Sequence, residues 1–228
     1  MNEEMVLLEK IVFTADSDRL RRKLRINAGS SSDKELESIL SEAEKIIRPS
    51  AVYFPAYIQK REEDCVVIDK VLFHSRVLAV NLKQAYRVFP YLVTCGQEAE
   101  DWHREMKDML HHYWADVIFQ MALHVALRAM EMDIRARYSY PNMASMSPGR
   151  LSHWPIEEQA ALFELLGEAP SRVGVRLLES FLMTPTKTLS GIRYPTEESF
   201  ESCQLCPREN CFGRKALYVP DLFVRKYA

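Results

Sequence analysis

Three cysteines near the end of the sequence are the residues best suited to chemistry. Cys203, Cys206 and Cys211 lie in the stretch SCQLCPRENCFGRKALY, separated by two and four residues. Thiolates clustered at such short spacing are typical ligands of soft metals and of iron–sulfur clusters. The spacing favours an iron–sulfur cluster over zinc, and a surface loop with unmetallated thiols is the alternative. A fourth ligand would have to come from Cys65, Cys95, a histidine or an exogenous group.

Four histidines lie where helices are predicted, at His103, His111, His112 and His124. No two of them have the i, i+4 spacing that places two imidazoles on one helix face around a metal. We therefore expect these histidines to be structural.

A Pro-Gly pair at Pro148 and Gly149 predicts a turn. The backbone N–H groups of a glycine turn can hold a polar or anionic ligand group. One Pro-Gly pair alone is weak evidence for a binding site, so the prediction depends on the elements around it.

The region around this turn is predicted to form a loop, a short helix and a strand hairpin. Pro155 suits the first helical position and Gly167 suits the helix end. The stretches 175–183 and 188–194 predict two strands, joined by a four-residue loop at 184–187.

Upstream, the pattern alternates between helices and strands. Ser32 and Glu35 have the spacing of a capping box, and Pro49 would end the helix that they begin. Short β-branched and aromatic runs predict strands, with a helical turn at 81–85. These runs are AVYFPAYI, CVVI, VLFH, VLAV and VFPYLV. Helices are then expected over 99–110 and 117–137.

Composition and length are ordinary for a globular protein. The chain has 228 residues, of which 47% are hydrophobic and 27% charged. Such a chain can bury a sizeable core. We expect one domain over 1–228, with an N-terminal helical segment at 1–50 and a cysteine-rich tail at 200–228.

The charge balance and the N-terminal stretch bear on partners and location. A net charge of −2 indicates neither nucleic acid nor a membrane as a partner. The stretch MNEEMVLLEK lacks the pattern of a secretory signal, so we expect a cytoplasmic protein. One local basic cluster fits either a solvated face or a site for an anion or acidic partner. It comprises Arg19, Arg21, Arg22, Lys23 and Arg25.

The order and spacing of several blocks in the second half resemble a known family. The blocks are Ser147-Pro148-Gly149, Phe163-Glu164-Leu165-Leu166, Leu178-Glu179-Ser180-Phe181, Met183, Pro185 and Leu189-Ser190-Gly191. In this order they resemble the activation domain of cobalamin-dependent methionine synthase, and most of all standalone proteins that carry that domain separately. The strand ending in Thr94-Cys95-Gly96 and the cysteine tail are also similar to standalone members. The resemblance covers roughly residues 65 to 218.

The resemblance implies a fold and a function. The fold is α+β, a twisted antiparallel sheet flanked by helices. The function is that of an accessory protein for reductive reactivation of a cobalamin-dependent methyltransferase, most of all methionine synthase, with remethylation by S-adenosylmethionine. The cobalamin would be carried by a corrinoid-binding partner, and a flavodoxin- or ferredoxin-like protein would supply the electron. The alternative is an iron–sulfur redox or scaffold protein that acts on a corrinoid protein without S-adenosylmethionine.

The resemblance also implies site residues. The S-adenosylmethionine cradle would comprise Ser147, Pro148, Gly149, Arg150 and Ser152. The corrinoid-facing edge would comprise Glu179, Ser180, Phe181 and Ser190. The metal ligands would be Cys203, Cys206 and Cys211, and no catalytic residue is assigned.

Three positions depart from the family pattern. Ser145 and Arg150 stand where the family has the arginine and tyrosine of an Arg-x-x-Pro-Gly-Tyr signature. Gln120 or His124 stands near the place of an acidic residue on the long helix. Arg150 is therefore the candidate to take over the ligand carboxylate.

Overall fold

The computed structural model describes residues 5–198, 200–211 and 213–228. The strands are β1 (Val6–Leu8), β2 (Ser50–Tyr53), β3 (Ala56–Arg61), β4 (Cys65–Ile68), β5 (Val71–His74), β6 (Arg87–Thr94), β7 (Met143–Met146), β8 (Arg176–Leu177), β9 (Met183–Thr184) and β10 (Thr188–Pro195). The helices are α1 (Ser17–Leu24), α2 (Ser31–Ile46), α3 (Arg76–Asn81), α4 (Gln97–Glu105), α5 (Met109–Tyr138), α6 (Gln159–Leu166), α7 (Ala169–Arg172) and α8 (Leu222–Tyr227), with short 3₁₀ turns at Ile156–Glu158 and Ser202–Leu205. None of the helices in this part of the chain combines the length and hydropathy needed for a membrane crossing.

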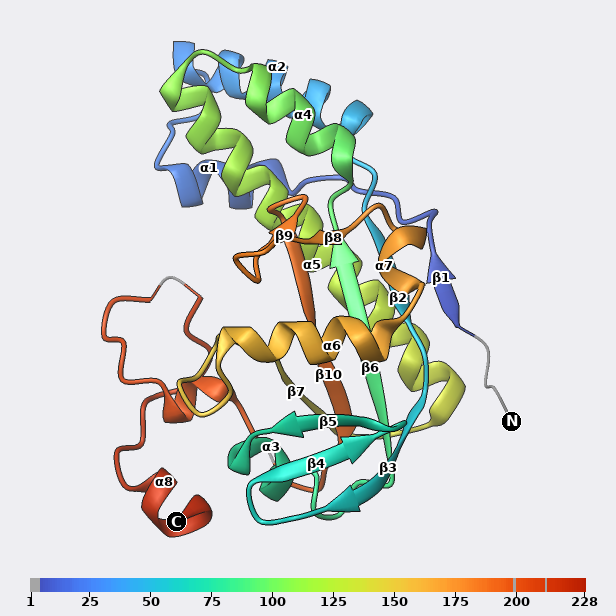
Figure 1. The fold of residues 1–228 in the computed structure, drawn as a ribbon. Helices are drawn as coiled ribbons and strands as arrows, with labels where there is room; N and C mark the ends of the chain where they lie inside the picture. Colours follow the sequence, from blue (N-terminus) through green and yellow to red (C-terminus); the bar gives the residue numbers. More distant parts are fainter. Residues whose placement is uncertain (1–4, 199, 212) are drawn as a thin grey trace.

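The strands β6 and β10 form the centre of an antiparallel sheet (Figure 1). On its other side β6 pairs with β2 near its end and with β3 near its start, and β3 leads into the β4–β5 hairpin. The second neighbour of β10 is β7. The predicted α+β fold with a helix-flanked antiparallel sheet is confirmed.

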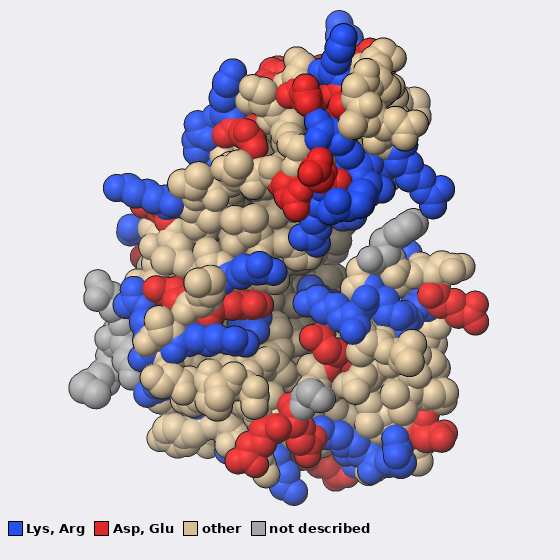
Figure 2. Space-filling model, turned by 180° about the vertical axis from the view of Figure 1, so that it is seen from behind, with Lys and Arg blue, Asp and Glu red and all other residues tan. Residues whose placement is uncertain are grey.

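One face of the sheet packs on α2 and the 30-residue α5. Ile118, Ala122 and Ala126 of α5 are fully buried against Phe89 and Val93 of β6. Asp108 caps the start of α5 by accepting from two backbone N–H groups, at 2.8 and 3.0 Å. The long helix ends near residue 137 as predicted, but it begins at Met109 rather than at 117, and the helix expected over 99–110 is divided between α4 and α5. Figure 2 shows the molecule from this side.

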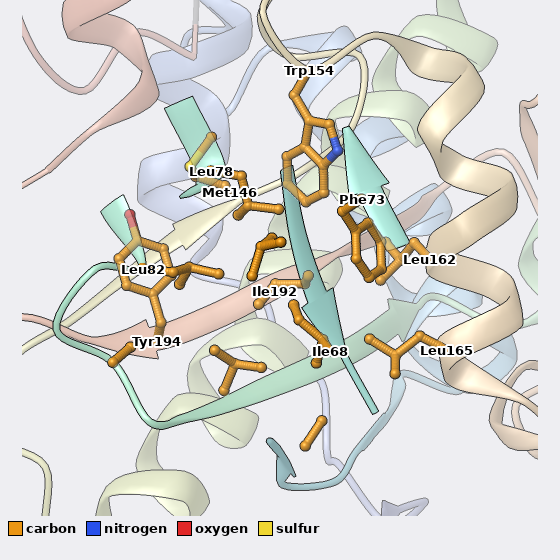
Figure 3. Packing of buried hydrophobic residues seen from close by; sticks show 14 of the residues in the cluster. Ile68, Phe73, Leu78, Leu82, Met146, Trp154, Leu162, Leu165, Ile192 and Tyr194 are labelled. Carbon is orange, nitrogen blue, oxygen red and sulfur yellow. The ribbon is translucent and has the colours of Figure 1, made fainter. Parts of the chain in front are cut away.

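The other face packs on α6 and the 151–154 loop (Figure 3). Trp154 and Phe73 are fully buried and meet edge to face, with ring centroids 6.2 Å apart. Leu162 and Leu165 of α6 lie beside them. The helix ends as predicted at Gly167, whose N–H donates to the carbonyls of Phe163 and Glu164.

Two upstream predictions were wrong. The cap of α2 is Ser30, not Ser32, and its hydroxyl accepts from the Asp33 N–H at 3.2 Å. The run VLAV predicted as a strand lies in α3, which Ser75 caps, and the helical turn expected at 81–85 follows that helix. A short apolar run fits a buried helix as well as a strand, and here the serine before it decides.

The predicted hairpin of 175–183 with 188–194 was also wrong. The first stretch forms only the two-residue strands β8 and β9, which pair with each other. The second stretch is β10, which pairs with β6 and β7 instead. The turn within Leu178–Leu182 reverses the chain before a long strand can form, since Leu178 N–H donates to Leu182 O at 2.8 Å.

Candidate functional site

The candidate site lies where one side of β10 is open. β6 accompanies β10 over Thr188–Arg193, but β7 pairs only with Ile192–Pro195. Lys187 O accepts from Cys95 N–H at 3.1 Å on the β6 side. Because backbone groups of successive strand residues point to opposite sides, those of Thr188 and Ser190 point to the open side.

The predicted Pro-Gly turn forms directly after β7. Arg150 N–H donates to Ser147 O at 3.4 Å, and Gly149 has φ +77° at the third turn position. Proline second and glycine third is the pattern of a type II turn, which requires this positive φ. A Cβ on Gly149 would lie 2.6 Å from the Ile156 side chain, so the turn packs closely on the start of the next helix.

A hydrogen bond and a close approach join this turn to β10. The Ser147 hydroxyl donates to Ser190 O at 2.5 Å and is buried. A Cβ on Gly191 would lie 2.5 Å from Met146 O and 2.6 Å from Ser147 Oγ. Gly191 is therefore required for the backbones of β7 and β10 to come this close.

Gln159 forms the polar floor of the site. Its side chain is 2% exposed, and its Nε2 donates to Ser190 Oγ at 2.5 Å and to Met183 Sδ at 3.2 Å. Within the described residues its Oε1 has no hydrogen-bond partner. Gln159 was not among the residues predicted for the site, although its position three residues before Leu162 on the buried side of α6 was a usable signal.

Phe181 approaches the site from the β8–β9 segment. Its N–H donates to Leu178 O at 2.9 Å, and its φ of +61° is unusual for a bulky residue. The side chain lines the site, while Glu179 and Ser180 of the same turn are exposed. A strained aromatic residue at a cavity often marks a binding site.

Together these segments enclose a cleft of about 280 Å³, the edge cleft. It is lined by Ser147, Pro148, Arg150, Ile156, Gln159, Phe181, Leu182, Met183, Thr186, Thr188, Leu189 and Ser190. The cleft thus joins two groups that the sequence analysis named separately: Ser147, Pro148 and Arg150 with Phe181 and Ser190. Gly149 shapes the turn behind it. Ser152 is exposed and, like Glu179 and Ser180, does not line it.

The loop that brings Thr186 and Thr188 to the cleft is attached to the helices. Thr186 N–H donates to a Glu100 carboxylate oxygen of α4, and Lys187 forms an ion pair of 3.1 Å with Asp116 of α5. Thr188 Oγ1 donates to Pro185 O at 2.7 Å. One wall of the cleft is therefore tied to helices on the opposite face of the sheet.

Two of the positions that depart from the family pattern lie outside the edge cleft. Ser145 shares a 3.0 Å hydrogen bond with the Tyr91 hydroxyl. Gln120 Oε1 accepts from Lys23 Nζ at 3.5 Å. Arg150 is exposed and is the one basic residue of the lining, which contains no acidic residue among those described.

The cysteine tail is organised by an arginine. Arg214 donates to the carbonyls of Cys203 and Cys206, each at 3.3 Å, and to that of Arg208. Lys215 N–H points at Cys203 Sγ, 3.4 Å away. Over the described stretches, no three His, Cys, Asp or Glu side chains are grouped so that they could hold a metal. The metal site at Cys203, Cys206 and Cys211 stays a prediction.

The other two cysteines are poor candidates for its fourth ligand. Cys95 is fully buried, donates to Phe119 O at 3.2 Å, and burial raises the pKa of its thiol to about 12. Burial, followed by the Glu62 carboxylate, raises the pKa of the Cys65 thiol. Both effects disfavour the thiolate that binds metals.

Comparison with known proteins adds a structural likeness. No family model and no curated protein matches the sequence. Among solved structures, the chain is similar to one described as "Crystal Structure of the MetH Reactivation Domain bound to AdoHcy". The match has a TM-score of 0.55 at 16% identity, and covers 88% of this chain and 82% of the other. The fold of this protein is that of the MetH reactivation domain, as the sequence resemblance predicted.

Proposed function

We propose that this chain, acting as one unit, binds an S-adenosylmethionine-type ligand in the edge cleft and assists reductive reactivation of a cobalamin-dependent methyltransferase, most of all methionine synthase. The observation that carries the proposal is the convergence of Ser147, Pro148 and Arg150 with Phe181 and Ser190 in one cleft. The similar solved domain holds AdoHcy, the product that such a ligand leaves after methyl transfer. Because fold alone does not establish function, the cleft chemistry must support the proposal separately.

The lining suits the parts of such a ligand. Arg150 can pair with a carboxylate, and guanidinium groups bind carboxylates strongly. The ring of Phe181 can stabilise a sulfonium, because an aromatic face attracts cations. Backbone groups of Thr188 and Ser190 on the open side of β10 can bind further polar atoms. The Gln159 Oε1 is an acceptor with no partner in the described chain.

The cleft is small for this ligand. Ligand sites usually enclose about 300 to 1,000 Å³, and the edge cleft encloses about 280 Å³. Part of the ligand would therefore project from it toward a partner. We place the corrinoid-carrying protein at this mouth, where Glu179 and Ser180 are exposed. A ligand held this way would present its methyl group to the cobalamin, since the protein's part is positioning.

Calorimetric titration with S-adenosylhomocysteine tests the proposal. We expect a saturable heat, and about a tenfold rise in Kd for Arg150→Ala, which corresponds to one charge-assisted hydrogen bond. Arg172→Ala is the matched control, because Arg172 is exposed and does not line the cleft. Absence of heat at millimolar ligand, with the corrinoid partner both present and absent, would contradict the proposal.

The cysteine tail supports a separate proposal, that of a redox-active cluster. Cys203 and Cys206 lie three residues apart, and Arg214 donates to the carbonyls of both, which fixes the loop that carries them. Anaerobic reconstitution with iron and sulfide should then give absorbance in the visible region that is lost in Cys206→Ser. A colourless product, or one unchanged by that substitution, counts against this role.

A further inference from the structure

A second cavity lies on the α5 side of the sheet and shares no lining residue with the edge cleft. It encloses about 360 Å³ between α1, the segment before it, and α5, and we refer to it as the basic groove. Its lining comprises Phe13, Thr14, Asp16, Arg19, Lys23, Met121, His124, Val125, Arg128, Ala129 and Met132. In Figure 2 lysine and arginine side chains gather around a hollow on this face.

The groove has an apolar floor and a cationic rim. Phe13, Met121 and Val125 supply apolar surface, while Arg19, Lys23 and Arg128 are exposed cations. Asp16 is the one acidic residue of the lining, and its carboxylate already accepts from the Arg19 N–H at the start of α1. The lining is thus net positive.

The rim cations are not used to hold the fold together. Within the described chain, Arg19, Lys23 and Arg128 form no ion pair, and the one polar contact of Lys23 is to the neutral Gln120 at 3.5 Å. Arg21 on the same helix contrasts with them, since it forms ion pairs with Asp18, Asp33 and Glu37. The cations that face the groove therefore remain available to an anion from outside.

The electrostatic environment of His124 adds one further cation to the groove. Burial, and then the charges of Lys215, Lys23 and Arg19, lower the pKa of its imidazole. Lys215 belongs to the C-terminal tail, so cations reach this point from two separate parts of the chain. The groove thus concentrates positive charge beside apolar surface.

We propose that the basic groove binds a small molecule with an apolar body and an anionic head, a carboxylate or a phosphate. The volume fits a small molecule, and the three walls come from α1, its preceding segment and α5. Guanidinium and ammonium groups on the rim would bind the head, and Phe13, Met121 and Val125 would contact the body. The site is separate from the edge cleft and does not depend on the function proposed for that cleft.

Fluorescence titration with 1-anilinonaphthalene-8-sulfonate, an aromatic anion, tests this inference on the full chain. We expect saturable binding, with a Kd about tenfold higher in Lys23→Glu and in Arg128→Glu. Arg22→Glu on α1 and Arg135→Glu on α5 are matched controls, because both are exposed, outside the lining, and change the net charge equally. They should leave the Kd within about twofold. Circular dichroism confirms that each variant is folded.

Further measurements distinguish specific binding in the groove from nonspecific attraction of anions. Neutral N-phenyl-1-naphthylamine should bind much more weakly than the sulfonate, and the anion should shift the His124 ring proton in NMR spectra. Displacement by phenyl phosphate or by benzoate identifies the preferred head. The proposal is overturned if the control variants weaken binding equally, if the neutral dye binds equally well, or if neither competitor displaces the sulfonate. Displacement of the sulfonate by S-adenosylhomocysteine also overturns it. A dimer of this chain that Lys23→Glu or Arg128→Glu dissociates does so as well.

Discussion

In the edge cleft the polar atoms are held by hydrogen bonds within the protein, whereas in the basic groove the charged side chains project from helices into solvent. Ser147, Gln159 and Ser190 are all more than nine-tenths buried and bond to one another or to the backbone. Arg19, Lys23 and Arg128 are exposed. The cleft can therefore select a ligand by shape and fixed hydrogen bonds, while the groove attracts by charge. Substitutions of the buried residues at the cleft should therefore destabilise the fold, whereas substitutions of the groove cations should weaken only binding.

The largest expected effect is that of Gly191→Ala at the cleft. The added Cβ would overlap Met146 O and Ser147 Oγ, at 2.5 and 2.6 Å, and backbone atoms cannot move away cheaply. We expect a loss of about 3 kcal/mol in the free energy of unfolding, measured by urea denaturation. Gly213→Ala is the control, since nothing lies within 4 Å of its Cβ position. If both variants are equally stable, β7 and β10 do not pack as described.

The second-largest effect is expected for a charge introduced at the floor of the edge cleft. Gln159→Glu places a carboxyl group where the side chain is 2% exposed, so burial should raise the pKa of that carboxyl. A raised pKa means that the variant is near wild-type stability below about pH 4.3, the unfolded value, and loses stability as pH rises. A rise of about two pKa units costs about 2.7 kcal/mol.

Thermal denaturation between acidic and weakly alkaline pH measures this effect. The exposed Gln84→Glu serves as the control and should show the pH dependence of the wild type. A flat difference between Gln159→Glu and the wild type across pH would show that the site is open to water.

A paired substitution on α1 compares a structural cation with a groove cation. Arg21→Gln removes ion pairs to Asp18, Asp33 and Glu37, and should lower the melting temperature. Lys23→Gln removes no ion pair recorded among the described residues and should leave the melting temperature nearly unchanged, as is usual at the surface. Calorimetry on both variants measures the two melting temperatures. A larger decrease for Lys23→Gln would show that the groove cations stabilise the fold.

The smallest effect is expected at His124. Arg214→Ala should release the tail that carries Lys215, since Arg214 donates to carbonyls on both sides of the Cys203–Arg208 loop. Losing one nearby cation moves the His124 pKa upward, toward its ordinary value, although burial still lowers it. NMR titration of the ring protons measures this shift, with Arg208→Ala as the control. An unchanged pKa would place Lys215 outside the influence of the groove.

The parts of the fold that could be predicted are those that local rules determine. The end of α5 near residue 137 follows from apolar periodicity, and the end of α6 follows from Gly167, whereas the starts of both helices were placed incorrectly. The turn that interrupts the predicted strand 175–183 could not be predicted, because Leu178–Leu182 contains neither glycine nor proline. The partner strands of β10 are β6 and β7, which lie far from it in the sequence, so only tertiary packing selects them.

The candidate site was partly predictable for the same reason. The Pro148-Gly149 turn and the blocks around Phe181 and Ser190 carry local signals, and the structure brings them together. Gln159 was missed because a glutamine within a helix is usually solvated, and its burial depends on contacts with Ser190 and Met183 from another segment. The basic groove combines α1 with α5, about 100 residues later, so the sequence showed Arg19 and Lys23 but neither Arg128 beside them nor the apolar floor.

The early end of β7 has a consequence beyond ligand binding. An uncovered strand edge can pair with a strand of another molecule, and the end of β7 leaves Thr188–Gly191 without a strand on one side. Pro148 stops β7 from extending along it, because a proline cannot donate to a sheet ladder. Thr188 and Ser190 are nonetheless buried, so the turns that line the cleft, rather than a further strand, protect this edge from pairing with another molecule.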